Sequence, residues 1–242
     1  MSIRRAGTAR TIGPARTINT ALYPALQAAQ LADSPLGLWP LQETSGSVAA
    51  DESGNGRDGT YTGGTLGAAA IDGVGLSSYT TGRVTIAYGS WMNTDSWTCE
   101  ILVSSTNGAN YKSPMGRNGV AAHGILWTWQ AGGATNSFYG NAGTPTVSPD
   151  TATGVGTGTP YLLAAKWDKG AGTCSIWLDG VSIASASNSG ASADKPVDSP
   201  LYLGDCTPGS YPWAGSIAYA AYYGTALSDA RLLAHAQAVG PA

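Results

Sequence analysis

Short runs of β-branched and aromatic residues, separated by glycine, asparagine, aspartate and serine, recur along the chain from about Leu36 to its end. Runs of this length, bounded by turn-forming residues, are typical of the strands of a sandwich or jelly roll. The pattern predicts an all-β fold, a jelly-roll sandwich of two sheets. The predicted strands are residues 37–41, 83–86, 97–104, 124–129, 161–168, 173–178, 181–185, 201–203 and 216–223.

The segment 173–181 carries the clearest strand and turn pattern. In 173–178 every second residue is aliphatic or cysteine, which is the period of a strand with one face in a core. We expect the other face, which carries Trp177, to be partly exposed. Asp179 and Gly180 follow at once, and this pair favours the two positive φ angles of a type I′ turn. A β-hairpin is therefore predicted here.

The end of the chain has a helical pattern instead. Ser228 suits the N-cap position, because its hydroxyl can accept a hydrogen bond from a backbone N–H of the first turn. Asp229 follows it, and Leu232, Leu233 and Ala236 are expected on one apolar stripe. The sandwich is therefore expected to carry a short C-terminal helix.

Residues 1–35 differ in kind and are predicted to form an arm, while residues 36–242 form the sandwich. The tetrapeptide Ala-Arg-Thr-Ile occurs at 9–12 and again at 15–18. Its β-branched residues and the proline between the copies favour extended backbone, whereas Pro24 suits the start of a short helix at 25–31. Such a segment is not expected to be ordered alone, so we expect other chains of an assembly to hold residues 1–32. The residues expected to make these contacts are Arg4, Arg5, Arg10, Ile12, Arg16, Ile18, Leu22 and Tyr23.

Charge is sparse and unevenly distributed. Only 11% of the residues are charged and the formal net charge is −3, against about 25% charged residues in ordinary domains. All 15 acidic residues lie at Asp33 or later, so the four arginines before it make the arm +4 and leave the remainder at −7. This distribution argues against nucleic acid as a partner of the body.

Neither a membrane nor the secretory route is expected. No apolar run approaches the roughly 18 residues of a membrane span. The residues after Arg4 and Arg5 lack the apolar stretch of a signal peptide.

The three cysteines specify no disulfide framework, because their number is odd and their spacing is wide. We favour buried free thiols for Cys99, Cys174 and Cys206. Alternatively, Cys99 and Cys174, which fall in predicted strands, could face each other across the sandwich.

An ordered set of motifs resembles laminin-G-like and concanavalin-A-like jelly-roll domains. The opening LGLWPLQETSG at 36–46 and the loop DESGNGRDGTY at 51–61 follow the pattern of that family. The later matches are SWTCEILV at 96–103, WLDGV at 177–181, LYLG at 201–204, WAGSI at 213–217 and YYGTALSD at 222–229. The resemblance covers residues 36–238 and implies the same two-sheet sandwich.

A second resemblance concerns the lead-in AQLADSP at 29–35. Joined to a short arm, it is similar to laminin-G-like proteins of actinobacterial tailed phages, which are minor tail or capsid decoration proteins. This resemblance implies a non-enzymatic structural virion protein, assembled in the host cytoplasm, whose arm contacts capsid or tail subunits and whose sandwich meets host-surface glycan. The alternative is a free carbohydrate-binding module, in which the N-terminal segment is a linker.

Family members that bind calcium use the acidic glycine loop with aspartates of a late strand. In this loop Asp51, Ser53, Asn55 and Asp58 could supply oxygen ligands. The late strand, however, reads GSIAY at 215–219 and lacks both aspartates. We favour an Asx-type turn held by its own side-chain hydrogen bonds, and apart from this candidate calcium ion no cofactor is expected.

Catalytic chemistry finds little support. Glycoside hydrolysis needs two paired carboxylates, but the only glutamates, Glu43, Glu52 and Glu100, form no such motif. His123 and His235 are expected to have structural roles, His235 at the surface or near the C-terminal end of the last helix.

Carbohydrate binding needs exposed aromatic faces beside polar groups. The candidates are Trp91, Tyr111, Trp127, Trp129 and Tyr139. Trp127 and Trp129 are two residues apart, so on a strand both project from one face. That face is either a sugar platform or part of the sandwich core.

Overall fold

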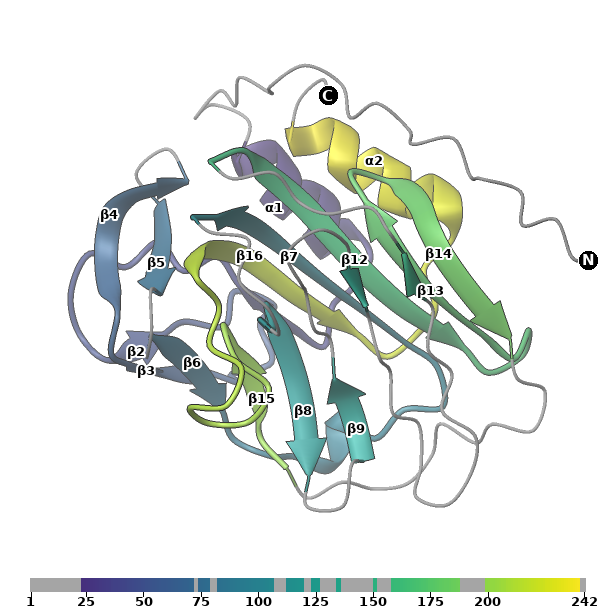
Figure 1. Ribbon diagram of the computed structural model, residues 1–242, viewed down its shortest axis with the longest axis horizontal. Helices are drawn as coiled ribbons and strands as arrows, with labels where there is room; N and C mark the ends of the chain where they lie inside the picture. Colours follow the sequence, from purple (N-terminus) through teal and green to yellow (C-terminus); the bar gives the residue numbers. More distant parts are fainter. Residues whose placement is uncertain are drawn as a thin grey trace, which may run out of the picture.

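The computed structural model describes residues 23–71, 74–78, 82–106, 112–119, 123–126, 134–135, 150–151, 158–187 and 199–239. Within these ranges the protein has three layers: two antiparallel sheets pack face to face, and two helices cover the outer side of the larger sheet (Figure 1). The predicted all-β sandwich with a short C-terminal helix is confirmed. Among the described residues, neither helix has the length and apolar character needed to cross a membrane.

The larger sheet has the strand order β14-β13-β12-β7-β16-β5-β4, and β1 also pairs with β16. Its strands are β1 (Gly37–Trp39), β4 (Thr65–Ile71), β5 (Val74–Ser78), β7 (Trp97–Ser105), β12 (Pro160–Asp168), β13 (Thr173–Leu178), β14 (Val181–Ser187) and β16 (Gly215–Tyr223).

The smaller sheet has the order β2-β3-β6-β15-β8-β9. Its strands are β2 (Val48–Ala49), β3 (Gly59–Thr62), β6 (Arg83–Ile86), β8 (Met115–Gly119), β9 (His123–Leu126) and β15 (Leu201–Leu203). A separate pair is formed by β10 (Ala134–Thr135) and β11 (Asp150–Thr151). The helices are α1 (Tyr23–Ala32), the short 3-10 helix η2 (Ser90–Met92) and α2 (Asp229–Val239).

The strand β7 shows how the layers are built. All nine of its residues are buried, because alternate side chains of a strand point to opposite faces and both faces are covered. Cys99 and Ile101 enter the core between the sheets. Leu102 instead joins the cluster of apolar residues beneath the helices, together with Leu26 of α1 and Ala236 of α2.

The hairpin predicted after β13 is present. Asp179 and Gly180 have φ angles of 47° and 73°, as a type I′ turn requires. A side chain at Gly180 would also collide with α2, since its Cβ would lie 2.7 Å from the Cα of Leu233. The expectation that Trp177 is partly exposed was wrong: only 6% of its surface is accessible, because α2 covers it through Leu232.

The C-terminal helix begins as predicted. The backbone N–H of Arg231 donates to Oγ of Ser228 over 3.3 Å, which is the N-cap bond. Leu232 and Ala236 are buried against the larger sheet, but Leu233 is 42% exposed. The expected stripe is therefore narrower, because Leu233 is turned by about 100° from its neighbour around the helix axis.

The helix α1 is longer than the predicted 25–31 and packs against α2 and the larger sheet. Leu26 and Gln30 of α1 are completely buried, and Leu26 contacts the cluster beneath the helices. Residues 23–32, which the sequence groups with the arm, thus contact the sandwich. The other predicted arm contacts lie outside the described residues: Arg4, Arg5, Arg10, Ile12, Arg16, Ile18 and Leu22.

Candidate functional site

Of the five aromatic residues predicted to bind glycan, Trp91 lies in the described part of the chain. The other four fall outside it: Tyr111, Trp127, Trp129 and Tyr139. Trp91 belongs to η2 and is half-buried. The guanidinium of Arg57 lies 4.1 Å from the centre of its ring, and Tyr222 meets it edge-on with centroids 5.8 Å apart. One face of Trp91 is therefore covered by a cation and is closed to a sugar.

The loop after β2 is organised by the carboxylate of Asp51. Its Oδ1 accepts hydrogen bonds from the backbone N–H groups of Leu38 and Ser53, at 3.0 and 2.9 Å, and its Oδ2 accepts one from Arg57 at 2.9 Å. Burial alone would raise the pKa of Asp51, but these hydrogen bonds to the ionised form outweigh it and lower the pKa. The loop thus has the bonding of an Asx-type turn.

The other predicted calcium ligands also bond within the loop. Oδ1 of Asp58 accepts from the backbone N–H of Asp51 at 2.9 Å. Asn55 donates through Nδ2 to the carbonyl of Pro35 at 3.2 Å and to Oγ of Ser53 at 3.0 Å. Within the described ranges, no three His, Cys, Asp or Glu side chains are placed to hold a metal ion. The Asx-type turn favoured from the sequence accounts for the hydrogen bonds of these residues, and calcium binding stays the alternative.

One face of the smaller sheet points away from the core, and its described side chains are polar except for that of Val48 in the edge strand β2, which is 52% exposed. Alternate residues of this sheet enter the core, among them Tyr61, Val84, Ile86, Leu201 and Leu203. The residues between them point outward, because successive side chains of a strand alternate. Val48 pairs with Thr60 at the edge of this face. The outward positions of the strands beyond β2, which we call the outer face, are Thr60, Thr62, Arg83, Thr85, Gly116 and Tyr202.

Tyr202 lies at the middle of the outer face. It is paired with Thr85 on one side and with Gly116 on the other, so one flank of its ring faces a strand position without a side chain. Partial burial raises the pKa of its hydroxyl; the charge of Arg83 lowers the pKa and that of Asp205 raises it, and the net shift is upward. The hydroxyl therefore stays protonated at neutral pH and can both donate and accept a hydrogen bond.

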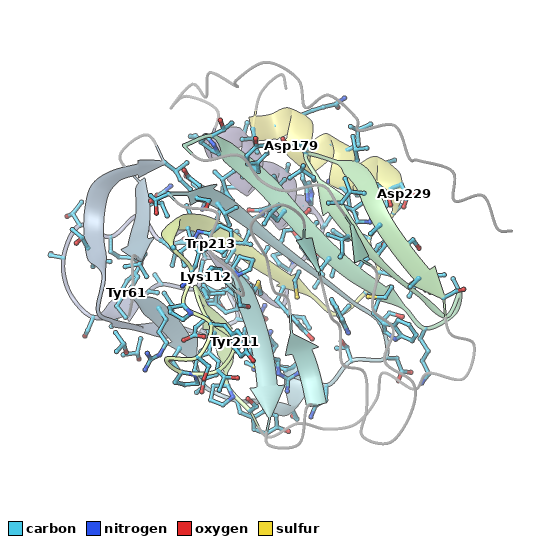
Figure 2. The ribbon with its side chains drawn as sticks, in the orientation of Figure 1. Tyr61, Lys112, Asp179, Tyr211, Trp213 and Asp229 are labelled. Atoms are coloured by element: carbon cyan, nitrogen blue, oxygen red, sulfur yellow. The ribbon has the colours of Figure 1, made fainter. Side chains whose placement is uncertain are left out.

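The carboxylate of Asp205 is committed to the backbone beside this face. It is 1% exposed, and it accepts hydrogen bonds from the N–H groups of Cys206 and Gly209, both at 2.8 Å, and from Thr207 and Tyr211, both at 3.2 Å. Asp205 therefore shapes the loop after β15 rather than pairing with a side chain of the outer face. Figure 2 places Tyr211 of this loop on the smaller-sheet side of the molecule and Asp179 and Asp229 beside α2.

Sequence reasoning missed the outer face. The signal was present, since Arg83 and Thr85 alternate with Val84 and Ile86, and Tyr202 stands between two leucines. A period of two identifies a half-buried strand, but it does not say which outward residues of separate strands become neighbours.

The three glutamates do not form a catalytic pair. Glu43 accepts hydrogen bonds from the N–H of Ala50 at 2.8 Å and from the hydroxyl of Tyr61 at 2.6 Å. Glu100 is completely buried, and Glu52 is exposed on the loop after β2. In the described part of the chain these three carboxylates thus have separate surroundings.

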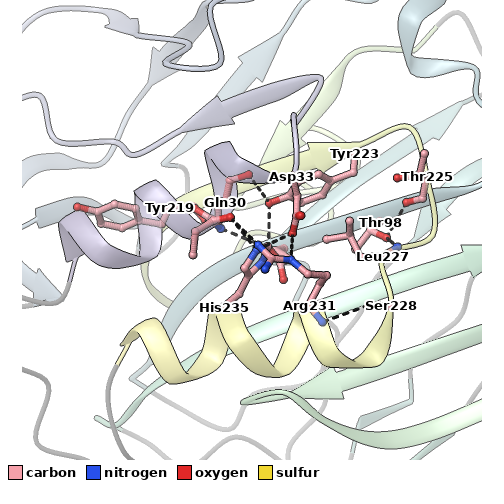
Figure 3. Close-up of polar contacts among 12 residues, drawn as sticks. Gln30, Asp33, Thr98, Tyr219, Tyr223, Thr225, Leu227, Ser228, Arg231 and His235 are labelled. Atoms are coloured by element: carbon pink, nitrogen blue, oxygen red, sulfur yellow. Dashed lines mark hydrogen bonds and ion pairs between the residues drawn. The ribbon is translucent and has the colours of Figure 1, made fainter.

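A polar cluster is buried between the helices and β7 (Figure 3). Three donors converge on Oε2 of Glu100: His235 Nδ1 at 2.8 Å, the hydroxyl of Tyr223 at 3.2 Å and Nε2 of Gln30 at 3.5 Å. Asp33 accepts from Nε of Arg231 at 2.7 Å. The cluster joins α1, α2, β7 and β16, so its evident role is to hold the helices on the sheet.

His235 is the centre of this cluster, which corrects its expected position at the surface. Its Nε2 lies 2.9 Å from Oδ2 of Asp33 and 3.0 Å from the carbonyl of Ala29. Both ring nitrogens therefore face acceptors, and only the protonated imidazolium can donate from both. Burial lowers the pKa of His235, but Glu100 and then Asp33 raise it more, so that the net shift is upward.

The three cysteines are buried free thiols, as favoured from the sequence. Burial raises the pKa of Cys206 to about 12 and raises that of Cys99 well above its ordinary value. Thiols of this kind are poor nucleophiles, so they offer no catalytic group.

A family model described as the concanavalin A-like lectin/glucanases superfamily matches residues 59–232. The chain belongs to this superfamily. The matched range of this lectin/glucanase-superfamily member includes the smaller sheet from β3 onward, and with it every residue of the outer face. A comparison with curated protein sequences finds no match.

Solved structures share the fold of this superfamily member. Domain 4 of a GH43 extracellular arabinanase from Geobacillus stearothermophilus, in complex with arabinotriose, aligns with a TM-score of 0.59 and 16% identity, over 84% of this chain and 98% of that one. The CBM40 of the Ruminococcus gnavus IT-sialidase, bound to α2,3-sialyllactose, gives 0.57 and 20%, over 66% and 95%. The binding domain of Paraclostridial Mosquitocidal Protein 1 gives 0.65 and 13%, over 84% and 52%.

Proposed function

We propose that this protein is a non-catalytic carbohydrate-binding domain whose ligand lies on the outer face of the smaller sheet. The observation that carries the proposal is the setting of Tyr202. Its ring is half-exposed between Thr85 and Gly116, on a face lined by threonine hydroxyls. An aromatic ring supplies apolar contact to the C–H groups of a sugar, and neighbouring hydroxyls donate and accept hydrogen bonds with sugar hydroxyls.

Two further observations support this choice of face. The helices α1 and α2 cover the face of the larger sheet that points away from the core, and these two helices leave the outer face of the smaller sheet uncovered. Two of the similar folds, the arabinanase domain and the CBM40, hold oligosaccharides. Their likeness in fold makes a sugar the first class of ligand to test.

We propose a non-catalytic role for the domain because Glu43 and Glu100 have other partners. Glu43 is engaged by Ala50 and Tyr61, and Glu100 is engaged by the buried cluster. A retaining or inverting glycosidase needs two carboxylates on opposite sides of one scissile bond. Glu52, which is exposed on its loop, cannot supply both roles.

We further propose that the domain is displayed on the particle of a tailed phage by its N-terminal segment. The lead-in at 29–35 and the +4 charge of the first 32 residues support this. So does the entry of the chain into α1 at Tyr23, in the helix layer. This layer and the outer face lie on opposite sides of the sheets. Tethering at α1 would leave the outer face free.

The test is binding of the full chain to an oligosaccharide array, followed by titration of the best neutral and acidic members. Tyr202→Ala should weaken binding about tenfold or more, which corresponds to ~1.4 kcal/mol. Leu233→Ala is the matched control, because it removes an exposed apolar side chain from α2. Equal affinity of Tyr202→Ala and the unmodified protein would place the ligand elsewhere, and no binding to any sugar would refute the function.

A further inference from the structure

The arginines in the described part of the chain differ in whether an oxygen acceptor holds the side chain. Arg57, Arg117 and Arg231 are each fixed by oxygen acceptors. Those acceptors are the carbonyl of Leu36 for Arg57, the carbonyls of Met92 and Ser199 with Oδ1 of Asn93 for Arg117, and Asp33 with the carbonyl of Ala29 for Arg231. The side chain of Arg83 makes no hydrogen bond and no ion pair with a described residue, and its Nε is buried without an acceptor.

An arrangement of this kind is unfavourable in the absence of a ligand. A buried donor left without an acceptor is destabilising, because it has lost its hydrogen bonds to water. A guanidinium also carries a positive charge. No carboxylate of the described outer face offsets this charge, because the other side chains there are threonines and Tyr202. Asp205, the carboxylate whose charge raises the pKa of Tyr202, accepts hydrogen bonds from backbone N–H groups instead.

Arg83 and Tyr202 occupy neighbouring positions on this face. Tyr202 is paired with Thr85, and Arg83 is two residues before Thr85 on the same side of β6. Such diagonal neighbours are within reach of each other's long side chains. Gly116, a position without a side chain, adjoins Tyr202 on its other side.

We propose, on the basis of the carbohydrate-binding function above, that the outer face binds an acidic sugar whose carboxylate is held by Arg83 while its ring lies on Tyr202. A guanidinium presents a planar set of N–H donors that matches the two oxygens of a carboxylate. The threonine hydroxyls of the same face serve the neutral hydroxyls of the sugar. The class of ligand is thus a carboxylate-bearing oligosaccharide, of either the uronic acid or the sialic acid type.

The first experiment uses the unmodified full chain and four probes. Trigalacturonate and its methyl ester differ only in the charge of the carboxylates, and 3′-sialyllactose and lactose differ only in the sialic acid. We expect the free acid of one pair to bind at least about tenfold more tightly than its neutral counterpart, as a charge-assisted pair implies. The pair that shows the difference distinguishes uronic from sialic acid. Equal binding of acid and neutral sugar within both pairs would overturn the inference and leave the proposed function intact.

The second experiment uses variants. Arg83→Gln removes the charge, Arg83→Lys keeps it without the planar donor set, and Lys169→Gln is the control because it removes one exposed positive charge paired with Asp95 at the β12–β13 turn. We expect Arg83→Gln to lose the preference for the acidic probe, Arg83→Lys to keep part of it, and Lys169→Gln to keep all of it. Thermal melts establish that each variant is folded. Should Arg83→Gln not fold, the comparison of acid and ester on the unmodified chain decides. Loss of preference in Lys169→Gln as well would show a general charge effect and overturn the role of Arg83.

Failure of the inference and failure of the proposed function look different. Binding of neutral sugars that depends on Tyr202 but not on Arg83 refutes the acidic ligand alone. Absence of binding to the four probes and to every sugar of the array refutes the function and the inference together.

Discussion

Nδ1 of His235 lies 2.8 Å from Oε2 of Glu100, and both side chains are completely buried between α2 and β7. The two residues are 135 positions apart in the sequence. Their contact joins the last helix to a central strand of the larger sheet. The imidazole also bonds to Ala29, which lies within α1, and to Asp33, which directly follows α1. One side chain of α2 therefore holds both helices in place.

Removal of the Glu100 carboxylate should destabilise the fold. Glu100→Ala leaves a buried imidazolium without its main partner, and breaking a buried ion pair on one side costs about 3–5 kcal/mol. Urea denaturation followed by circular dichroism measures the change. Glu52→Ala, which removes an exposed carboxylate, should leave the unfolding midpoint nearly unchanged. A loss for Glu100→Ala no larger than that for Glu52→Ala would contradict the stabilising role of the cluster.

Stability should also depend on pH through His235. Its pKa in the folded protein is raised above the ordinary 6.5, so the folded state binds the proton more tightly than the unfolded state. The stabilising contribution is complete below pH 6.5 and is lost as the pH rises through the folded-state pKa. The free energy of unfolding, measured from pH 6 to pH 9, should fall over this window. His235→Gln should flatten the curve there, and an unchanged pH dependence in that variant would rule out His235 as its source.

Calcium removal should leave the protein unchanged. Both oxygens of Asp51 already accept backbone hydrogen bonds, and Asp58 bonds to the backbone of the same loop. A bound ion at 100 times its dissociation constant would add about 2.7 kcal/mol of stability. We therefore expect equal melting temperatures in excess calcium chloride and in chelator. A rise of several degrees with calcium would show that the loop exchanges its internal hydrogen bonds for a metal ion.

Truncation should separate the N-terminal segment from the fold. Deletion of residues 1–22 removes no described contact and should leave the melting temperature unchanged. Deletion of residues 1–32 also removes Leu26 and Gln30, which are completely buried, and should lower it markedly, since a buried leucine alone contributes about 2–5 kcal/mol. Incorporation into particles of the variant that lacks residues 1–22 tests the display proposal. Normal incorporation of this variant would refute a tethering role of the N-terminal segment.

Sequence patterns located the strands whose own residues favour extended backbone. The strands β6, β13 and β15 have the predicted bounds, and each consists largely of β-branched, aromatic or alternating apolar residues. The strands β4 and β5, with the sequences TLGAAAI and VGLSS, were missed. Glycine, alanine and serine have low strand propensity, so pairing of β5 with β16, and of β4 with β5, decides their structure.

The buried cluster was missed for a different reason. Glu100 stands in the apolar run CEILV, and His235 shares the spacing of Leu232, Ala236 and Val239. Each position suggests burial when it is considered alone. Their partnership, however, follows from a helix packing on a sheet, which no local pattern encodes. The outer face shows the same limit, because Arg83 and Tyr202 become neighbours only through the order β6-β15.

The alternation within β6 and β15 has a practical consequence for engineering. Residues that would select a ligand and residues that build the core are interleaved one by one: Arg83 and Thr85 with Val84 and Ile86, and Tyr202 between its leucines. Substitutions at the outward positions can therefore be recombined freely, at little expense to stability. A single inserted or deleted residue would exchange the two sets and unfold the sheet. Libraries for new specificities should vary every second residue and keep the strand lengths fixed.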